Sequence, residues 1–429
     1  MQPLTRLPGA TAGSITRPGA KCKLSRSIVL GVPDQSVPWY LSSMTDRVYL
    51  DWNASAPLRT SARAVAVAML ERTGNPSSVH AEGRDVRQAI ERARGEVARL
   101  VGAEPGSVIF TSGATEANAL ALSPGWVRNP GDGLFARLLV SAVEHPSVRE
   151  GGRFDRGKVG LIPVDDQGVI ELGALRDRLA GPPALVSVML ANNETGVVQP
   201  ICEVARIVHE AGGLLHVDAV QAPGRIGCDF KALGADLLTL SAHKIGGPRG
   251  VGALIRNAGL HLEDALARGG GQERGLRAGT ENVPGIAGFG AAAAEMSGQS
   301  DAEVAHAKRL RTMLETGLRR VTPDVVIFGE DTERLPNTTC FSHPGLLAET
   351  AVIGFDLAGV AVSSGSACSS GKVQPSHVLA AMGVDPALAR GAIRVSTGCS
   401  TKDADIDRFL SAWTKLAESL LKGRKSIAA

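Results

Sequence analysis

Two segments, L-L-H-V-D-A-V-Q at residues 214–221 and L-L-T-L-S-A-H-K at residues 237–244, decide the fold. Each is a short aliphatic run that ends in polar, titratable side chains. Such runs are typical of buried strands in a mainly parallel sheet covered by helices. In these sheets, ligands bind in the crevice outside the carboxyl ends of the strands. The two segments therefore predict an α/β fold and the place of its functional site.

Strand and helix patterns alternate on both sides of these segments. An apolar stripe from Val86 to Leu100 predicts a helix, and a second is expected over residues 201–211. Strands are expected at residues 48–51, 107–111, 138–143, 184–190, 214–217, 236–241 and 251–255. This alternation favours an α/β layered architecture with a mainly parallel, mixed sheet.

The remaining part of the chain predicts a second, smaller α+β domain. Its expected helices are residues 302–321, 348–357 and 404–421, and its expected strands are residues 325–328 and 338–341. We assign residues 64–299 to the large domain. Residues 48–63 and 300–429 are assigned together to the small domain.

The composition is that of a globular protein and excludes several kinds of partner. Of the 429 residues, 44% are hydrophobic and 21% are charged, and the formal net charge is only +3. Basic and acidic side chains are interspersed along the sequence. It therefore has no basic stripe of the kind that would predict binding to nucleic acid or to a membrane surface. No apolar run approaches the roughly 18 residues of a membrane helix. We expect a soluble, cytoplasmic protein.

The cysteines and the remaining motifs give no sign of a metal or a nucleotide. The six cysteines include no C-x-x-C pair, so neither a zinc site nor a disulfide framework is predicted, and a reducing compartment fits best. H-E-x-x-H and P-loop motifs are absent from the sequence. The run Gly269-Gly270-Gly271 does not follow a strand and open a helix, so it is no dinucleotide motif.

Residues 1–47 are interpreted as a basic leader outside the mature fold. Residues 1–33 contain basic but no acidic side chains and show no helical periodicity. A transit peptide has this composition. The alternative is translated sequence upstream of the true start, which we favour because Met44 stands just before the first expected strand.

Polar residues at four strand ends are expected to converge on one crevice. They are S-G-A-T at residues 112–115, E-H-P at 144–146, and the ends of the two segments quoted first. Taken singly, His145 and Lys244 would be interpreted as structural or solvated side chains, and Thr115 as an ordinary helix cap. Convergence of titratable groups is instead typical of a catalytic site.

The residue types at these strand ends suit pyridoxal phosphate (PLP). The turn before Thr115 offers free N–H groups at a helix start to a phosphate, and Ser241 and His243 would add donors. Asp218 suits a ring nitrogen that must stay protonated, and Gln221 suits a phenolate oxygen. A lysine beside them can form a Schiff base.

With these motifs the chain resembles fold-type I, class V PLP enzymes, and specifically group I cysteine desulfurases of the NifS/IscS type, over residues 48–421. The resemblance rests on Y-L-D-W-N-A-S-A-P, G-N-P-S-S-V-H, F-T-S-G-A-T-E-A-N, V-E-H-P-S-V, A-N-N-E-T-G, H-V-D-A-V-Q, S-A-H-K, G-G-G-Q-E-R-G-L-R-A-G-T-E-N and S-S-G-S-A-C-S-S-G. Trp52 and Asn53 stand where the family varies and are assigned no role.

The resemblance implies a role for each candidate residue. Lys244 would hold PLP covalently, Asp218 would pair with the ring nitrogen and Gln221 with the ring hydroxyl. His145 would stack on the ring and assist proton transfer. The phosphate ligands would be Thr115, Ser241, His243 and, from the other subunit of a homodimer, Thr280. The ligands of the substrate carboxylate would be Asn193 and Arg394.

Cys368 distinguishes the members of this family from one another. It lies in a Ser- and Gly-rich run, residues 363–371, whose composition predicts a mobile backbone and which resembles the long loop of group I enzymes. The implied reaction takes sulfur from L-cysteine, leaves L-alanine, and stores the sulfur as a persulfide on Cys368. An iron–sulfur scaffold is one expected acceptor, although the tail, residues 422–429, does not match the tail that housekeeping members use to dock it.

Two other interpretations stay open at this point. Another class V enzyme, such as a selenocysteine lyase or an aminotransferase, would share the cofactor site, but transamination needs no nucleophile such as Cys368. A non-catalytic PLP-binding or sulfur-relay protein would share the fold, but it would not need both Lys244 and Cys368.

Overall fold

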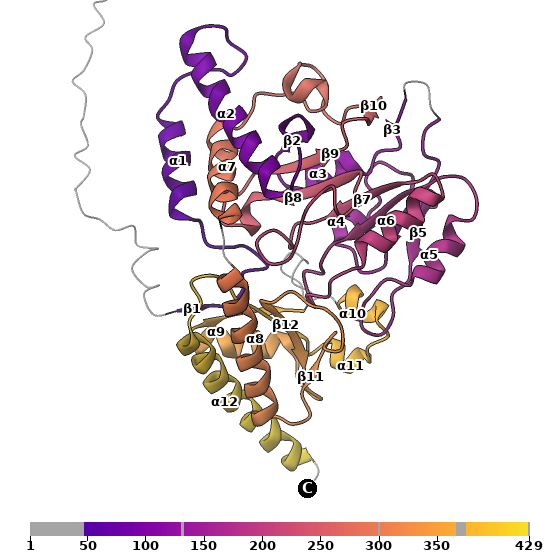
Figure 1. Ribbon diagram of the computed structural model, residues 1–429. Coiled ribbons are helices and arrows are strands. Elements are labelled where there is room, and N and C mark those ends of the chain that lie inside the picture. Colours follow the sequence, from indigo (N-terminus) through magenta and orange to yellow (C-terminus); the bar gives the residue numbers. More distant parts are fainter. Residues whose placement is uncertain (1–46, 130–132, 299–300, 366–374, 428–429) are drawn as a thin grey trace, which may run out of the picture. The chain divides into compact units, whose positions relative to one another are not determined.

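A seven-stranded sheet with the order β2-β9-β8-β7-β6-β4-β5 forms the centre of the fold (Figure 1). Its strands are β2 (Val108–Thr111), β4 (Leu138–Ser141), β5 (Val159–Ile162), β6 (Leu185–Met189), β7 (Leu214–Asp218), β8 (Leu237–Ser241) and β9 (Gly252–Arg256). Strands β4 to β8 are parallel, and β9 is antiparallel to both of its neighbours. This computed structural model describes residues 47–129, 133–298, 301–365 and 375–427. The predicted α/β fold with a mainly parallel sheet is confirmed.

Helices cover both faces of this sheet because successive strand residues point to opposite sides. In β8, Leu238 and Leu240 pack in one cluster with α2, α5, α6 and α7, whereas Leu237 packs in another with α3 and α4. The helices of this part are α1 (Thr60–Leu70), α2 (Ala81–Leu100), α3 (Ala114–Ala121), α4 (Pro146–Arg149), α5 (Leu172–Leu179), α6 (Ile201–Glu210) and α7 (Val283–Ser297). A short pair, β3 (Trp126–Val127) with β10 (His261–Leu262), lies outside the sheet.

A second, antiparallel sheet with the order β11-β12-β15-β14 has a hydrophobic core of its own. Its strands are β11 (Val326–Ile327), β12 (Thr338–Ser342), β14 (Ser363–Ser364) and β15 (Ile393–Ser396). The helices here are α8 (Asp301–Val321), α9 (Ala348–Leu357), α10 (His377–Ala381), α11 (Pro386–Ala389) and α12 (Asp403–Ile427). Figure 1 shows α8 and α12 side by side. Phe355 and Phe409 stack in this core with ring centroids 4.7 Å apart.

The start of the described chain joins this second sheet. Strand β1 (Val48–Tyr49) pairs in parallel with β13 (Val360–Ala361), and Asp51 bridges to Ser396 of β15. Arg47 to Ala429 cluster as one compact unit. The division into a large and a small domain therefore stays a prediction, which the two separate cores support. The predicted leader lies outside the described residues, except for Arg47.

Two further results concern the described residues alone. None of their helices combines the length and the apolar character that crossing a bilayer requires. No group of three or more His, Cys, Asp or Glu side chains is placed there to hold a metal ion.

Candidate functional site

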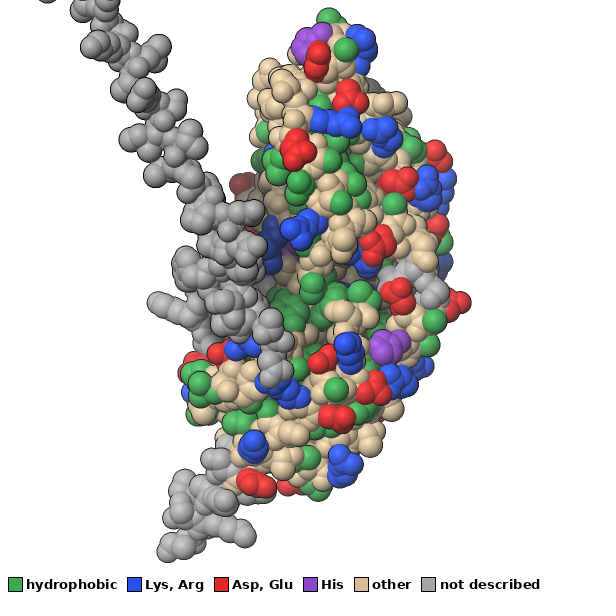
Figure 2. Space-filling view, turned by 90° about the vertical axis from the view of Figure 1, so that its left-hand side faces the viewer, with side chains coloured by type: hydrophobic (Ala, Val, Ile, Leu, Met, Phe, Trp, Pro, Cys, Tyr) green, Lys and Arg blue, Asp and Glu red, His purple; other side chains and the backbone are tan. Residues whose placement is uncertain are grey.

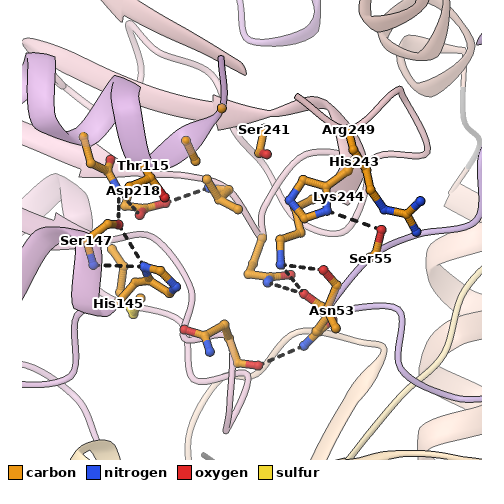
Figure 3. Close-up of a pocket in the computed structure, with 18 of the residues that line it drawn as sticks. Asn53, Ser55, Thr115, His145, Ser147, Asp218, Ser241, His243, Lys244 and Arg249 are labelled. Atoms are coloured by element: carbon orange, nitrogen blue, oxygen red, sulfur yellow. Dashed lines mark hydrogen bonds between the residues drawn. The ribbon is translucent and has the colours of Figure 1, made fainter. Parts of the chain in front are cut away.

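A cavity of about 450 Å³ lies at the carboxyl ends of the central strands. It is lined by most of the residues singled out in the sequence, namely Thr115, His145, Asn193, Asp218, Gln221, Ser241, His243, Lys244 and Arg394. Figure 3 shows Asp218, His145 and Lys244 around one space, with Thr115 and Ser241 along its edge. Thr280 is exposed and does not line this cavity. Cys368 lies outside the described residues.

The Asp218 carboxylate is held at the end of β7 by two hydrogen bonds. Its Oδ2 accepts from Asn118 Nδ2 at 2.9 Å, and its Oδ1 accepts from the Val220 N–H at 3.1 Å. The same Asn118 nitrogen donates to Ser147 Oγ at 2.9 Å. Asn118 lies on α3 and was not among the predicted residues. The one feature that could have indicated Asn118 in advance is its polar amide at a position that the short helix α3 buries.

Burial favours the neutral form of the His145 ring, and its hydrogen bonds indicate which nitrogen carries the proton. Burial lowers the pKa of His145; the charge of Asp218 opposes this shift and the charge of Lys244 adds to it. Nδ1 accepts from the Ser147 N–H at 3.2 Å and lies 2.8 Å from Ser147 Oγ. Because Nδ1 is used as an acceptor, the network assigns the ring proton to Nε2.

Glu144 precedes His145 but does not line the cavity, although the strand-end pattern placed the whole E-H-P motif there. Its side chain is fully buried, and one oxygen accepts from the Met189 N–H. Burial, with the charge of Asp218, raises the pKa of Glu144 well above its ordinary value. Burial thus favours the neutral form of Glu144 beside the cavity, and His145 is the member of the motif that lines the cavity.

Lys244 and Gln221 both contact the backbone of Asn53. The Lys244 ammonium donates to the Asn53 carbonyl at 2.5 Å and to the Ala54 carbonyl at 3.0 Å. Gln221 Nε2 donates to the same Asn53 carbonyl at 3.0 Å. The Asn53 side chain is buried and donates to Thr338 Oγ1 at 2.9 Å. Asn53 thus connects the Lys244 side of the cavity to the second sheet, a position that its local sequence does not indicate.

The turn between β2 and α3 borders the cavity at the start of a helix. Helix α3 begins at Ala114, directly before Thr115, and its first N–H groups border the cavity. Ser241 and His243 line the same end, where burial, followed by the charges of Lys244 and Arg249, lowers the pKa of His243 to about 4. Arg249 also lines the cavity and was not predicted.

Gly252 of β9 lets this turn pack closely on the sheet. A Cβ atom at residue 252 would lie 2.6 Å from the Gly113 carbonyl carbon and 2.9 Å from the Ala114 nitrogen. No side chain fits between these backbones without moving the turn.

Gly252→Ala is therefore expected to displace the start of α3 and to weaken cofactor retention about tenfold, with about 1–3 kcal/mol lost from the free energy of unfolding. Gly227→Ala, where a Cβ meets nothing within 4 Å, is the matched control. Dialysis followed by absorbance measures the retained PLP. Equal retention by the two variants would contradict the assignment of this turn to the phosphate.

Arg394 is buried within β15 instead of being a surface strand arginine. Nη1 donates to the Asn193 carbonyl at 2.9 Å, and Nη2 pairs with Asp51 Oδ1 at 2.7 Å. Its Nε–H has no hydrogen-bond partner among the described residues, although Arg394 is only 1% exposed. A buried donor without a partner is costly, so this group is available to a ligand acceptor such as a carboxylate.

Comparisons with known proteins agree with this geometry. Residues 48–409 match the family described as aminotransferase class-V. A cysteine desulfurase of Cereibacter sphaeroides is 42% identical over 381 residues, which cover 87% of this chain and 97% of that protein. Cysteine desulfurase IscS of Dictyoglomus turgidum is 40% identical over 88% of this chain and 96% of that protein. The X-ray structure of a NifS-like protein from Rickettsia africae ESF-5 superposes with a TM-score of 0.78 at 34% identity, covering 87% of this chain and 99% of that one.

Proposed function

This chain belongs to the aminotransferase class-V family, and from that premise we infer that it is a PLP-dependent cysteine desulfurase. Curated relatives named cysteine desulfurase match it at about 40% identity over nearly their whole length. The observation that carries the inference is the meeting of Lys244, Asp218, His145 and Arg394 in one cavity. These four groups would supply the covalent attachment, the partner of the ring nitrogen, a proton-transfer group and a carboxylate ligand, which a PLP site acting on an amino acid needs.

The residues of the cavity fit PLP in charge and in hydrogen-bonding capacity. We propose that Asp218 holds the ring nitrogen, that Gln221 donates to the ring hydroxyl, and that Lys244 binds the cofactor covalently. Thr115, Ser241 and neutral His243 with the first turn of α3 would hold the phosphate. When bound, PLP supplies an electron sink that weakens the bonds at the Cα atom of an amino acid.

The chain's own residues then have distinct tasks. Arg394 would bind the carboxylate of L-cysteine, assisted by Asn193, through its Nε–H, which has no partner in the part of the chain that the structure describes. Lys244 would accept and return a proton at the substrate Cα, and His145 would move a proton at Nε2. The Cys368 thiolate would form the new S–S bond to the substrate sulfur while the C–S bond breaks. The bonding electrons would stay on carbon, which takes up a proton to give L-alanine.

Incubating the purified protein with L-cysteine and a thiol reductant tests this function. Sulfide and L-alanine are expected in equal amounts, because each turnover makes one of each. Release of a keto acid in place of alanine would identify a different class V reaction. A parallel assay with selenocysteine would separate the two possible substrates.

We further propose that the protein works as a homodimer. Figure 2, which faces the side of α1, shows hydrophobic side chains among interspersed charges. Val67 and Leu70 of α1 are 47% and 71% exposed, and Val79, just before α2, is 87% exposed. Exposed apolar groups of this size support an interface with a second copy. Thr280, exposed in the single chain, would then be free to reach the neighbouring phosphate site.

Two further proposals concern the compartment in which the protein acts and the protein that receives its sulfur. We propose that the enzyme is cytoplasmic, as the interspersed charges and scattered cysteines suggest. The persulfide would pass to an acceptor protein such as an iron–sulfur scaffold, in keeping with the resemblance to the NifS/IscS type.

A chain beginning at Met44 is expected to fold as a PLP-containing homodimer with full activity, because every residue that lines the cavity lies beyond it. Light scattering after gel filtration measures its mass, and the full-length chain is the control. An insoluble product, or a monomer with full activity, would contradict the proposed assembly.

A further inference from the structure

The segment from Gln272 to Thr280 contacts both sides of the turn that begins α3, and the proposed function uses only Thr280 of it. Its short 3₁₀ helix, Gln272–Gly275, contains two non-glycine residues in the left-handed region, Glu273 at φ 45° and Arg274 at φ 59°. This conformation is unfavourable for residues other than glycine and persists only where the surrounding structure fixes it. Contacts with the rest of the fold must therefore hold this segment in place.

Glu273 attaches the segment to the strand that precedes the turn. Its carboxylate receives the fork of Arg94, with Oε2 2.7 Å from Nη1 and Oε1 2.8 Å from Nη2, and both residues are buried. Oε2 also accepts from the Phe110 N–H at 3.0 Å. Phe110 lies in β2, the edge strand of the central sheet, so Glu273 satisfies a backbone donor at that edge.

Arg277 attaches the segment to the helix that follows the turn. Its Nε donates to Glu116 Oε1 at 2.8 Å, and its Nη2 donates to Glu116 Oε2 at 3.3 Å. Glu116 lies in the first turn of α3, directly after Thr115. Its Oε2 also accepts from the Ser112 N–H at 2.8 Å. Because Ser112 and Thr115 both line the cavity, Arg277 is connected through Glu116 to the turn proposed to bind the phosphate.

Glu116 brings a negative charge to this turn. Burial alone would raise the pKa of its carboxyl, but the hydrogen bonds from Arg277 and Ser112 outweigh burial and hold the pKa below its ordinary value. An acidic side chain and a phosphate compete for the same positive end of a helix, and two like charges there repel each other. Among the described residues, the cation that pairs with Glu116 and offsets this repulsion is Arg277.

We propose that Arg277 is a positioning residue of the phosphate site: it neutralises Glu116 and holds its carboxylate on the Ser112 N–H, so that the first N–H groups of α3 stay available to the phosphate of the cofactor. Without Arg277, the charge of Glu116 would repel the phosphate and compete with it for these N–H groups. The inference rests on the proposed function, because it takes PLP to place its phosphate at this turn.

Release of the cofactor from the full-length protein tests the proposal, with pyridoxal as the comparison because it lacks the phosphate. The chain is loaded with either ligand, and the loss of the ligand after dilution is followed by absorbance. Arg277→Met should speed the release of PLP about tenfold and should leave the release of pyridoxal within about twofold of the wild type. Equal changes for the two ligands are the result of a merely structural role and would overturn the proposal.

Further variants separate the charge of Glu116 from its packing. Arg277→Met combined with Glu116→Gln removes both charges and should return PLP release to within about threefold of the wild type. A double variant that loses PLP as fast as Arg277→Met would contradict the role of the Glu116 charge. Arg277→Gln also removes the positive charge but can still hydrogen-bond to Glu116, so it replaces Arg277→Met if that variant fails to fold.

Arg206→Met is the matched control, because it removes an exposed arginine of α6 from an ion pair with Glu210 at 2.6 Å. It should release both ligands as the wild type does. A wild type that releases PLP and pyridoxal equally fast would refute the phosphate site and the proposed function with it. A wild type that holds PLP longer than pyridoxal, with Arg277→Met behaving identically, would refute the role of Arg277 alone.

Discussion

Lys244→Ala is expected to give a colourless protein that releases no sulfide from L-cysteine. Among the described residues that line the cavity, Lys244 is the one lysine, and it shares that space with Asp218 and the turn before α3. Alanine can neither bind the cofactor covalently nor return a proton to the substrate. The loss of kcat/KM should be on the order of 10³-fold or more.

Absorbance of the purified variant measures the colour, and Lys231→Ala is the control because Lys231 is exposed and pairs only with Glu104 in the described contacts, at 3.3 Å. Borohydride reduction of the wild type, followed by peptide mapping, should place the cofactor on the peptide that contains Lys244. A cofactor found on another lysine would refute the assignment.

Cys368→Ser is expected to bind PLP and L-cysteine normally and yet to release no sulfide. The groups assigned to cofactor and substrate carboxylate are Lys244, Asp218 and Arg394, and all three remain in this variant. A serine hydroxyl is a far weaker nucleophile than a thiolate at neutral pH, so sulfide release should fall at least about 10³-fold. Spectral changes on adding L-cysteine should persist.

Two exposed cysteines provide the controls. Cys202→Ser and Cys399→Ser should keep wild-type sulfide release, because neither lines the cavity. Alkylation of the wild type after brief exposure to L-cysteine should find the extra sulfur on the Cys368 peptide. Normal turnover by Cys368→Ser would exclude it as the acceptor of the substrate sulfur.

The central strands could be predicted because both of their faces are covered. In β7 and β8 every residue is buried, and each strand starts with two leucines and has a third aliphatic residue at its fourth position, so each is recognised as a short aliphatic run. Strand β5 was missed because it lies at the edge of the sheet, and its residues Val159, Gly160 and Leu161 are at most half-buried. Strand β15 was missed because it is short and has a charged Arg394 in its interior.

The cavity residues that could be predicted from the sequence are those that lie at or just after the end of a strand. Asp218 is the last residue of β7, and His145 and Lys244 come shortly after β4 and β8; these parallel strands end at the same edge of the sheet. Asn53 and Asn118 were missed because their roles come from tertiary contacts; Asn53 meets Gln221 across 168 positions of the chain. The roles of Thr280 and Cys368 stay predictions, because the first requires a second subunit and the second lies outside the described residues.

The pairing of Asp51 with Arg394 has a consequence for biosynthesis. These residues are 343 positions apart, as are Asn53 and Ser396, which also bond. A ribosome that adds about 5–20 residues per second needs roughly twenty seconds to a minute to make the intervening chain. A nascent chain that already contains Lys244 and Asp218 still lacks strand β15. This strand carries both Arg394 and Ser396, whose Oγ accepts from the Asn53 N–H. The cavity can therefore gain its full lining only after residue 394 has been translated.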